Sequence, residues 1–221
     1  MKRIPEPELM TDAEQALAYA NADFEEPHNH FIDLLKESFG NKIPEFGNAL
    51  DLGCGAADIS IRFAKAYPNY QIDAIDGASA MLAEGQRAVN NAGISERINL
   101  IQTNLQDTTL ADKKYAVIFC NAMLHHLHDP LVLWNLIRTA NNNPSIFVMD
   151  LMRPDSDEQV DVLVEKYASS EPEILKRDFR NSLKAAFTPE EVESQLGRAV
   201  LEQLVVSVVS DRHFTVSSVD D

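Results

Sequence analysis

The sequence predicts a doubly wound α/β fold, with a sheet of seven mostly parallel strands, helices on both faces and an antiparallel hairpin at one edge. The first observation is a glycine-rich turn at residues 53–57 that joins a short apolar run to a helical pattern. The second is the alternation of strand-like runs with helical patterns as far as residue 150, which is typical of a parallel sheet. The third is a pair of short strand-like runs within residues 204–216, which predicts the closing hairpin.

Length, composition and charge exclude several classes of protein. The chain has 221 residues, enough for one domain with a small extension, and 45% of them are hydrophobic. Its net charge is −16 and its 19 basic residues never form a run longer than two, so we expect no nucleic-acid partner. The apolar runs are too short to span a membrane, so we expect a cytoplasmic protein without a membrane partner. Cys54 and Cys120 are expected to be buried thiols in a reducing compartment.

Residues 1–47 are predicted to form an N-terminal helical cap ahead of a main domain at residues 48–221. The first ten residues are polar and contain prolines, so we expect an extended or disordered start. Thr11 and Glu14 predict a capping box for a first helix, which Phe24 and Pro27 are expected to end. A second helix is predicted over residues 30–39, where large apolar side chains share one face.

The glycine-rich turn follows the apolar run at residues 49–52. Glycine permits both the tight turn and a close approach of the backbone to a ligand, and the next helix presents its N-terminus there. A dinucleotide fingerprint would need a third glycine where this chain has Asp58, and no Gly-Lys-Ser/Thr sequence of a phosphate-binding loop is present. The turn therefore predicts a ligand other than a dinucleotide or a nucleoside triphosphate.

Asp76 ends the second predicted strand, at residues 70–76, where apolar and polar residues alternate. It follows the glycine turn by roughly 20 residues, the spacing at which a carboxylate binds ribose hydroxyls. The alternative is that Asp76 only caps the next helix, predicted from about Ser79 to Ala92 and stopped by Gly93.

The remaining parallel strands follow the same alternation. A third strand is predicted at residues 98–103, and the continuous apolar run at 115–120 predicts a central strand buried on both faces. Asn121 stands at its carboxyl end, where ligands bind in open parallel sheets. A helix at 131–140 leads to the fifth strand at 145–150.

The last part of the chain is predicted to carry a lid and the closing hairpin. Two helices, at 157–169 and 172–186, form a helical lid inserted at about 153–186. Thr188 and Glu191 predict a capping box for a final helix. Strands at 204–209 and 213–216 then form the antiparallel edge.

Three segments resemble the class I S-adenosylmethionine-dependent methyltransferases. These are Asp51-x-Gly53-x-Gly55, the run from Asp76 through Met81-Leu82, and the segment 121–130, which is similar to the family's L-H-H-L-x-D-P pattern. The resemblance implies a Rossmann-like sheet, S-adenosyl-L-methionine as cofactor and S-adenosyl-L-homocysteine as product. It also implies a set of cofactor-binding residues: Asp51, Gly53, Cys54, Gly55, Asp76, Gly77, Met81, Asn104, Leu105 and Asn121.

The sequence departs from the family pattern at three positions. Ala57 stands where a third glycine is frequent, and Ala116 replaces an aspartate that tends to be structural. Asn104 replaces the acidic residue at the adenine, where its carbonyl oxygen can still accept from the amino group, with Asp107 as a nearby alternative.

In this family, helices before the first strand and after the fifth commonly enclose the acceptor. Together with the negative charge of the chain, this favours a small-molecule substrate. The alternative is a peptide or carrier-bound acceptor that enters an open cleft. His126 and Asp178 are the candidate bases for an acceptor that must lose a proton. The candidate substrate-binding residues are Tyr19, Phe24, His126, Arg153 and Arg180. The alternative for each is an ordinary packing or solvated role.

The three histidines at 125, 126 and 128 suggest either a metal site or one histidine in the pocket with two structural neighbours. Adjacent ligands on one turn rarely converge and no H-x-x-x-H spacing is present, so we predict no metal. Two alternative functions remain open: a same-fold enzyme that uses the cofactor for other chemistry, and a non-catalytic cofactor-binding protein. We expect a monomer or homodimer.

Overall fold

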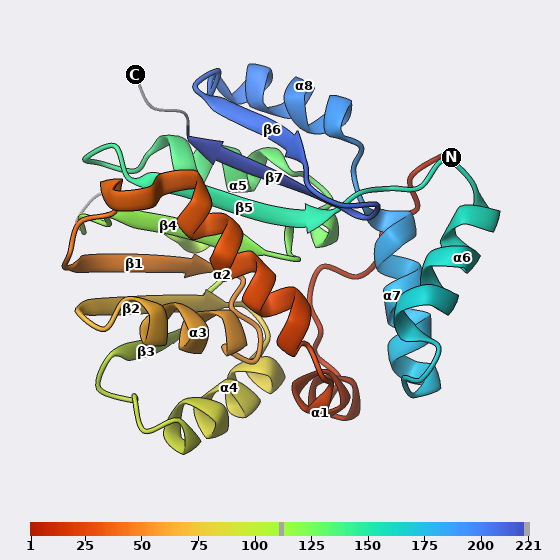
Figure 1. Cartoon of the computed structure of the whole chain (residues 1–221), viewed down its shortest axis with the longest axis horizontal. Helices are drawn as coiled ribbons and strands as arrows, with labels where there is room; N and C mark the ends of the chain where they lie inside the picture. Colours follow the sequence, from red (N-terminus) through yellow and green to blue (C-terminus); the bar gives the residue numbers. More distant parts are fainter. Residues whose placement is uncertain (111–112, 219–221) are drawn as a thin grey trace.

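The computed structural model describes residues 1–110 and 113–218, so the last three residues of the predicted 48–221 domain lie outside it. Its sheet has seven strands in the order β3-β2-β1-β4-β5-β7-β6, which confirms the predicted fold class (Figure 1). The five strands β1 to β5 run parallel, and β7 pairs antiparallel with both β5 and β6. The strands are β1 (Gly47–Leu52), β2 (Tyr70–Asp76), β3 (Ile98–Gln102), β4 (Val117–Asn121), β5 (Ser145–Leu151), β6 (Leu204–Val208) and β7 (His213–Ser218).

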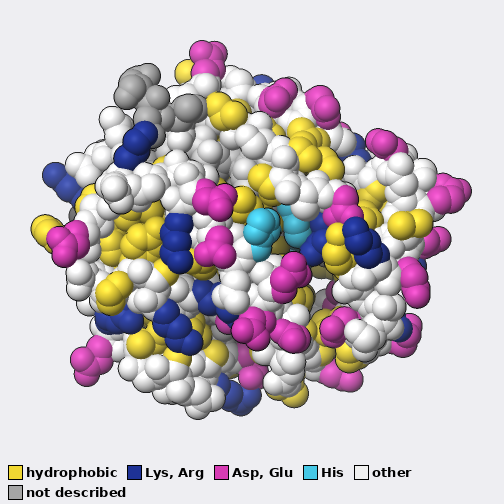
Figure 2. All heavy atoms as spheres, in the orientation of Figure 1, with side chains coloured by type: hydrophobic (Ala, Val, Ile, Leu, Met, Phe, Trp, Pro, Cys, Tyr) yellow, Lys and Arg dark blue, Asp and Glu magenta, His cyan; other side chains and the backbone are white. Residues whose placement is uncertain are grey.

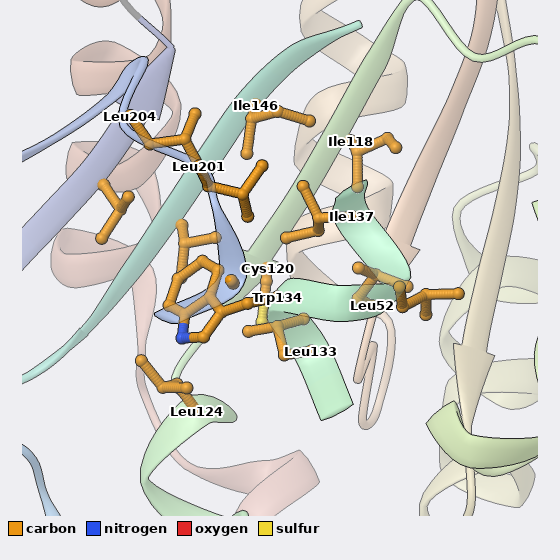
Figure 3. Packing of buried hydrophobic residues seen from close by; sticks show 14 of the residues in the cluster. Leu52, Ile118, Cys120, Leu124, Leu133, Trp134, Ile137, Ile146, Leu201 and Leu204 are labelled. Carbon is orange, nitrogen blue, oxygen red and sulfur yellow. The ribbon is translucent and has the colours of Figure 1, made fainter. Parts of the chain in front are cut away.

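Helices cover both faces of the sheet. On one face, α2 (Glu25–Phe39), α3 (Asp58–Ala66) and α4 (Ser79–Asn91) contribute to an apolar cluster with Phe31, Phe63, Phe119 and Phe147. On the other, α5 (Leu131–Arg138) and α8 (Pro189–Ala199) pack together over a second cluster around Trp134. Figure 3 shows this tryptophan among side chains from β4, α5 and the segment before β6. Because both faces are covered, the central strands are almost wholly apolar.

Three further helices lie at the end of the sheet where the parallel strands finish. α1 (Ala13–Asn21) packs against α4 and α7 (Glu173–Ala185), and α7 packs against α6 (Asp157–Ala168). Figure 1 shows α6 and α7 beyond the arrowheads of the central strands. Short 3-10 turns complete the list of elements: Gly40–Lys42, Leu105–Asp107 and Leu124–His126.

The two N-terminal helices differ from the sequence prediction. α1 is capped by Asp12, whose side chain accepts from the backbone N–H of Gln15, and not by Thr11. α2 begins at Glu25, so Pro27 lies in its first turn and does not end the preceding helix. Proline is tolerated there because the first N–H groups of a helix have no partner within the helix. The capping box predicted at Thr188 and Glu191 is confirmed.

Residues 1–10 form an extended segment, here called the N-terminal strap. Arg3 donates to the carbonyl oxygens of Ala185, His125 and Leu127 at 2.5, 2.7 and 3.0 Å, and its guanidinium stacks on the ring of Phe187. The strap therefore ties the loop after β4 to the end of α7. In the part of the chain that the structure describes, no helix is both long and apolar enough to cross a membrane.

Candidate active site

A cavity of about 1150 Å³ opens at the carboxyl ends of the parallel strands. Its walls come from β1, β2, β4 and β5 together with the strap, α1, α2 and α7. Most of the predicted site residues line it: Tyr19, Phe24, Asp51, Gly53, Cys54, Gly55, Asp76, Gly77, Met81, Asn104, Leu105, Asn121, His126 and Asp178.

The glycine turn forms one end of this cavity. Gly53 and Gly55 adopt φ angles of 76° and 51°, in the left-handed region that favours glycine. A Cβ atom at Gly53 would lie 2.4 Å from Cγ of Met123, so the turn needs glycine for space as well as for conformation. At Gly55 the nearest atom to an added Cβ is the terminal methyl of Met81 at 3.0 Å. A side chain at either position would therefore crowd the wall of the cavity.

Asp76 is tied to the turn and not to the following helix. Its two carboxylate oxygens accept from the backbone N–H groups of Gly55 and Ala78 at 2.9 and 2.7 Å. The alternative of a simple helix cap does not hold, because α4 starts at Ser79 with Ala78 as its cap residue and no side-chain cap bond. Burial raises the pKa of Asp76, and the two N–H donors oppose that rise by stabilising the carboxylate.

Asp51 lies on the neighbouring strand and is only 1% exposed. It accepts a hydrogen bond from Oγ of Ser60 at 2.5 Å. Burial raises its pKa to about 7, against the effect of this hydrogen bond and with a smaller contribution from the charge of Asp76. The cavity wall beside the glycine turn thus contains a carboxyl group that can be neutral or charged near physiological pH.

At the opposite side of Asp76, Gly77 and Asn104 lie against the strap. A Cβ at Gly77 would meet Oδ1 of Asn104 at 2.6 Å and Cδ2 of Leu9 at 2.8 Å. The Asn104 side chain also donates to Asp107 at 3.3 Å, so both residues considered for the adenine position are neighbours.

The second end of the cavity contains a buried histidine–aspartate pair. His125 is 2% exposed and Asp150 is 1% exposed; Nδ1 of the histidine lies 2.5 Å from Oδ1 of the aspartate. The backbone N–H of His125 donates to the other carboxylate oxygen at 3.2 Å. Burial alone lowers the pKa of His125, but the charge and hydrogen bond of Asp150 outweigh it and raise the pKa overall. Such a pair fixes the ring and turns Nε2 away from the aspartate.

Sequence reasoning missed this pair and chose the neighbouring His126 as the base. His126 lines the cavity, with Nδ1 at 3.3 Å from the carbonyl oxygen of Pro7, and burial together with the nearby His125 lowers its pKa to about 3. Asp150 carried a usable signal, since it stands at the carboxyl end of the predicted fifth strand, beside the strand that leads to the histidines.

Glu6 of the strap also belongs to the site and was not predicted. Its Oε1 lies 3.5 Å from Nε2 of His125 and 3.4 Å from Nδ1 of His126, and it accepts from Oγ of Ser182 at 2.9 Å. The argument that adjacent histidines would not converge is therefore wrong for this pair. The donor atoms of Glu6, His125 and His126 lie within 4.8 Å of one another, an oxygen–nitrogen set that could hold a divalent cation.

The two arginines predicted to bind substrate lie away from the cavity. Arg153 is 8% exposed and is held by the carbonyl oxygen of Ala186 at 3.0 Å and by Glu191 at 2.6 Å. Arg180 forms an exposed ion pair with Asp161 between α6 and α7. Their positions correct the prediction: Arg153 ties the end of β5 to α8, and Arg180 lies on the outer surface of the lid.

The other predicted acceptor residues do reach the cavity. The rings of Tyr19 and Phe24 lie 4.8 Å apart, and Phe24 stacks on His28 at 5.0 Å. Asp178 on α7 accepts from the side-chain amide of Gln15 on α1 at 2.8 Å. The contact joins the first helix to the lid across the cavity mouth.

The fold is similar to that of solved S-adenosylmethionine-dependent methyltransferases, and a family model matches the part of the chain that carries the motifs. Residues 49–143, which include the glycine turn, Asp76 and the histidines, match the family model described as a methyltransferase domain. The resemblance seen in the sequence motifs is therefore confirmed.

Three relatives illustrate the similarity. The malonyl-[acyl-carrier protein] O-methyltransferase 1 of Ilyobacter polytropus is 30% identical over 113 residues, which are 51% of this chain and 40% of that protein. A methyltransferase from Aquifex aeolicus superimposes with a TM-score of 0.67 at 19% identity, covering 94% of this chain and 97% of the other. The plantazolicin methyltransferase BpumL, in complex with a triazolic desmethylPZN analog and S-adenosylhomocysteine, superimposes with a TM-score of 0.66 at 15% identity, covering 93% of this chain and 95% of the other. The two structures show a shared fold, and this chain spans less than half of the curated relative.

Proposed function

We propose that this chain is an S-adenosylmethionine-dependent methyltransferase acting on a small-molecule acceptor. The observation that carries the proposal is the continuity of one cavity between two sites. The glycine turn with Asp76 lines one end, and the His125–Asp150 pair lines the other. One end is suited to bind a nucleoside-containing cofactor and the other to remove a proton from an acceptor.

The residues present fit the cofactor. Asp76 has a fixed carboxylate for ribose hydroxyls, because Gly55 and Ala78 hold its oxygens from the backbone side. Asn104 and Leu105 would line the adenine, and the turn with Asp51 would hold the methionine end. When bound, the cofactor supplies an electrophilic methyl group on a sulfonium sulfur.

The chain's own contribution at the acceptor is proton removal and alignment. In its neutral form His125 would accept a proton at Nε2, and Asp150 would hold the ring and stabilise the imidazolium that forms. This arrangement favours His125 over His126 and Asp178 as the base, although both predicted residues lie in the same cavity. The strap, α1 and α7 close over the site and would exclude water from the reacting atoms.

The proposal is tested by incubating the protein with S-adenosylmethionine and metabolite fractions, then measuring S-adenosylhomocysteine and the methylated product. Both should accumulate in equal amounts. Consumption of S-adenosylmethionine without formation of S-adenosylhomocysteine would favour other chemistry on the same fold. A cofactor that binds and is never consumed would favour a non-catalytic binding protein.

Enclosure of the acceptor is tested by removing residues 2–7, which takes away Glu6 and leaves Leu9 beside Gly77 at the cofactor end. We expect turnover to fall by roughly tenfold or more, because the strap supplies Glu6 and closes the cavity, while cofactor affinity changes by less than about threefold. Normal methylation by the truncated protein would contradict an enclosed site and favour an acceptor carried by a larger partner.

We further propose that the protein works in the cytoplasm as a monomer or homodimer. Cys54 and Cys120 are both free and buried, as suits a reducing compartment, and burial raises the pKa of both thiols. Light scattering on the purified protein tests the oligomeric state, and a larger assembly would contradict this part of the proposal.

A further inference from the structure

The charge of the cavity wall is strongly one-sided. Twelve of the lining side chains carry carboxylates, whereas the basic lining residues are three arginines and no lysine. Each arginine already has a carboxylate partner: Arg62 with Asp58 at 2.8 Å, Arg87 with Glu84 at 2.6 Å and Arg212 with Asp211 at 3.7 Å. The whole chain has fewer than two acidic residues for each basic one. The ratio of acidic to basic residues is therefore higher in the cavity wall than in the whole chain. A sulfonium cofactor accounts for one positive charge at one end only.

The acceptor end of the cavity, defined here as Glu6, His125, His126, Asp150, Asp178 and Phe179, contains no arginine or lysine. Its members come from the strap, the turn after β4, the end of β5 and helix α7. Figure 2 shows the face of the molecule seen in Figure 1, where histidine side chains lie near the centre with acidic and basic side chains beside them.

Glu6 is a mostly buried carboxylate at the acceptor end. Its side chain is 12% exposed, and within the described residues its ion-pair partners are the two histidines at 3.5 and 3.4 Å. Burial raises the pKa of Glu6, with His125 opposing the rise, which means that its negative charge is poorly stabilised as the site stands. Arg3, on the same strap, is occupied by three backbone carbonyl oxygens.

Asp178 is the second carboxylate at this end. It is held in place by Gln15 on α1, and its other oxygen accepts from the neighbouring Arg177 at 3.0 Å. Aromatic rings complete the wall, with Phe179 beside it on α7 and Tyr19 and Phe24 across the cavity. Carboxylates next to aromatic faces are suited to a cationic group on an apolar skeleton, because both attract positive charge.

We propose that the acceptor is a small amine, bound as its ammonium ion by Glu6 and Asp178 and methylated on nitrogen. The inference rests on the proposed methyltransferase function and names the substrate class of that site. Neutral His125 would take one proton from the ammonium group, freeing the nitrogen lone pair. That pair then forms the new N–C bond as the methyl–sulfur bond breaks, with the bonding electrons left on sulfur as a neutral thioether. The product is an N-methylammonium ion.

The first test measures binding without turnover. Protein saturated with S-adenosylhomocysteine is titrated by calorimetry with a panel of primary and secondary amines, each matched to an alcohol and a carboxylate of the same skeleton. Phenethylamine, 2-phenylethanol and phenylacetate form one such set. We expect amines to bind at least about tenfold more tightly than the matched alcohols, with carboxylates weakest. If no amine in the panel binds more tightly than its matched compounds, the inference is overturned.

The second test assigns the preference to the named carboxylates. Glu6→Gln and Asp178→Asn should each weaken binding of the best amine by about tenfold while leaving the affinity of its matched alcohol unchanged. Glu14→Gln, at an exposed position of α1 outside the cavity wall, is the control and should bind the amine normally. Unchanged cofactor affinity confirms that each variant is folded. Equal amine affinity in the Gln, Asn and wild-type proteins would refute the assignment.

The two proposals fail separately. Selective amine binding without any methylated product would refute the methyltransferase function. The preference of the site for a cationic ligand would not be affected. Methylation of an alcohol or a carboxylate in preference to its matched amine would refute the amine inference while the methyltransferase function stood.

Discussion

The two ends of the cavity are built in different ways. The cofactor end comes from three nearby segments of the chain, residues 51–58, 76–81 and 104–105, and its carboxylate Asp76 is held by two backbone N–H groups. The acceptor end combines Glu6, His125, Asp150 and Asp178, which are spread over most of the chain and interact through side chains. Backbone-built sites depend on local spacing, whereas side-chain-built sites depend on how distant elements pack.

The difference has a consequence for mutation. A change at the acceptor end should alter turnover more than cofactor affinity, and a change at the cofactor end should do the reverse. Four predictions test this division.

The largest effect is expected from Asp150→Asn. The amide cannot stabilise the imidazolium of His125, so turnover should fall by about 10²–10³-fold, with cofactor affinity within about threefold of wild type. Asp33→Asn, at an exposed position of α2, is the matched control. Turnover and calorimetric affinity are measured on both variants. Full activity of Asp150→Asn would remove His125 from the role of base.

At the cofactor end, Asp76→Ala should weaken S-adenosylmethionine binding by about 1–3 kcal/mol, because ribose hydroxyls and two backbone N–H groups lose their acceptor. Asp33→Ala, at an exposed position outside the cavity wall, serves as the comparison and should change affinity by less than about threefold. Calorimetry with S-adenosylmethionine and with a nicotinamide dinucleotide checks both. Tighter binding of the dinucleotide would contradict the assignment of the turn.

Acid should destabilise the protein through two histidines that are neutral in the folded state. Burial lowers the pKa of His126 and of His213 to about 3, with His125 and Arg212 respectively adding to the effect. Unfolded histidine titrates near about 6.5, so the unfolded chain gains protons first as pH falls. The stabilisation is therefore complete above that pH and is lost progressively toward pH 3, by about 2 kcal/mol per histidine at pH 5.

His126, with 22% of its side chain exposed, should contribute the smaller share of this loss. Chemical unfolding at pH 7.5 and at pH 5 measures this loss for the wild type and for His213→Gln. Between the two pH values the free energy of unfolding should fall less in the variant than in the wild type. His125 acts in the opposite direction: burial alone would lower its pKa, but Asp150 raises it, so its contribution is present at low pH and is lost as pH rises through the raised value. Equal losses in the two proteins would show that His213 is not neutral when folded.

The smallest effects at the site are expected from the two arginines outside the cavity. Arg153→Ala should lower the free energy of unfolding by about 2 kcal/mol, because it removes a mostly buried bridge between β5 and α8. Arg180→Ala should cost less than about 0.5 kcal/mol, as its ion pair is exposed. Neither should change the KM for the acceptor. A raised KM in either variant would return that arginine to the substrate site.

The sequence by itself determined the sheet and the cofactor end. Alternating apolar runs specify the strands and helices. The number of residues between the two glycines and Asp76 is set by the strand–turn–helix unit, which has the same geometry wherever it occurs. Gly53 needs its left-handed backbone conformation for the turn itself, so local rules suffice to find it. The errors at this level were small, as with Asp12 in place of Thr11, because neighbouring polar residues compete for one cap position.

Only the tertiary structure decided the acceptor end. The strap looked like an untethered start, yet it places Glu6 against His125 from more than a hundred residues away. Which of two adjacent histidines meets Asp150 depends on the path of the turn after β4; the sequence pattern favoured His126, whereas His125 makes this contact. Arg153 looked like a substrate ligand until its partner Glu191 appeared on a distant helix. Side-chain pairing of this kind follows from the packing of elements that are remote in sequence, and no local spacing encodes it.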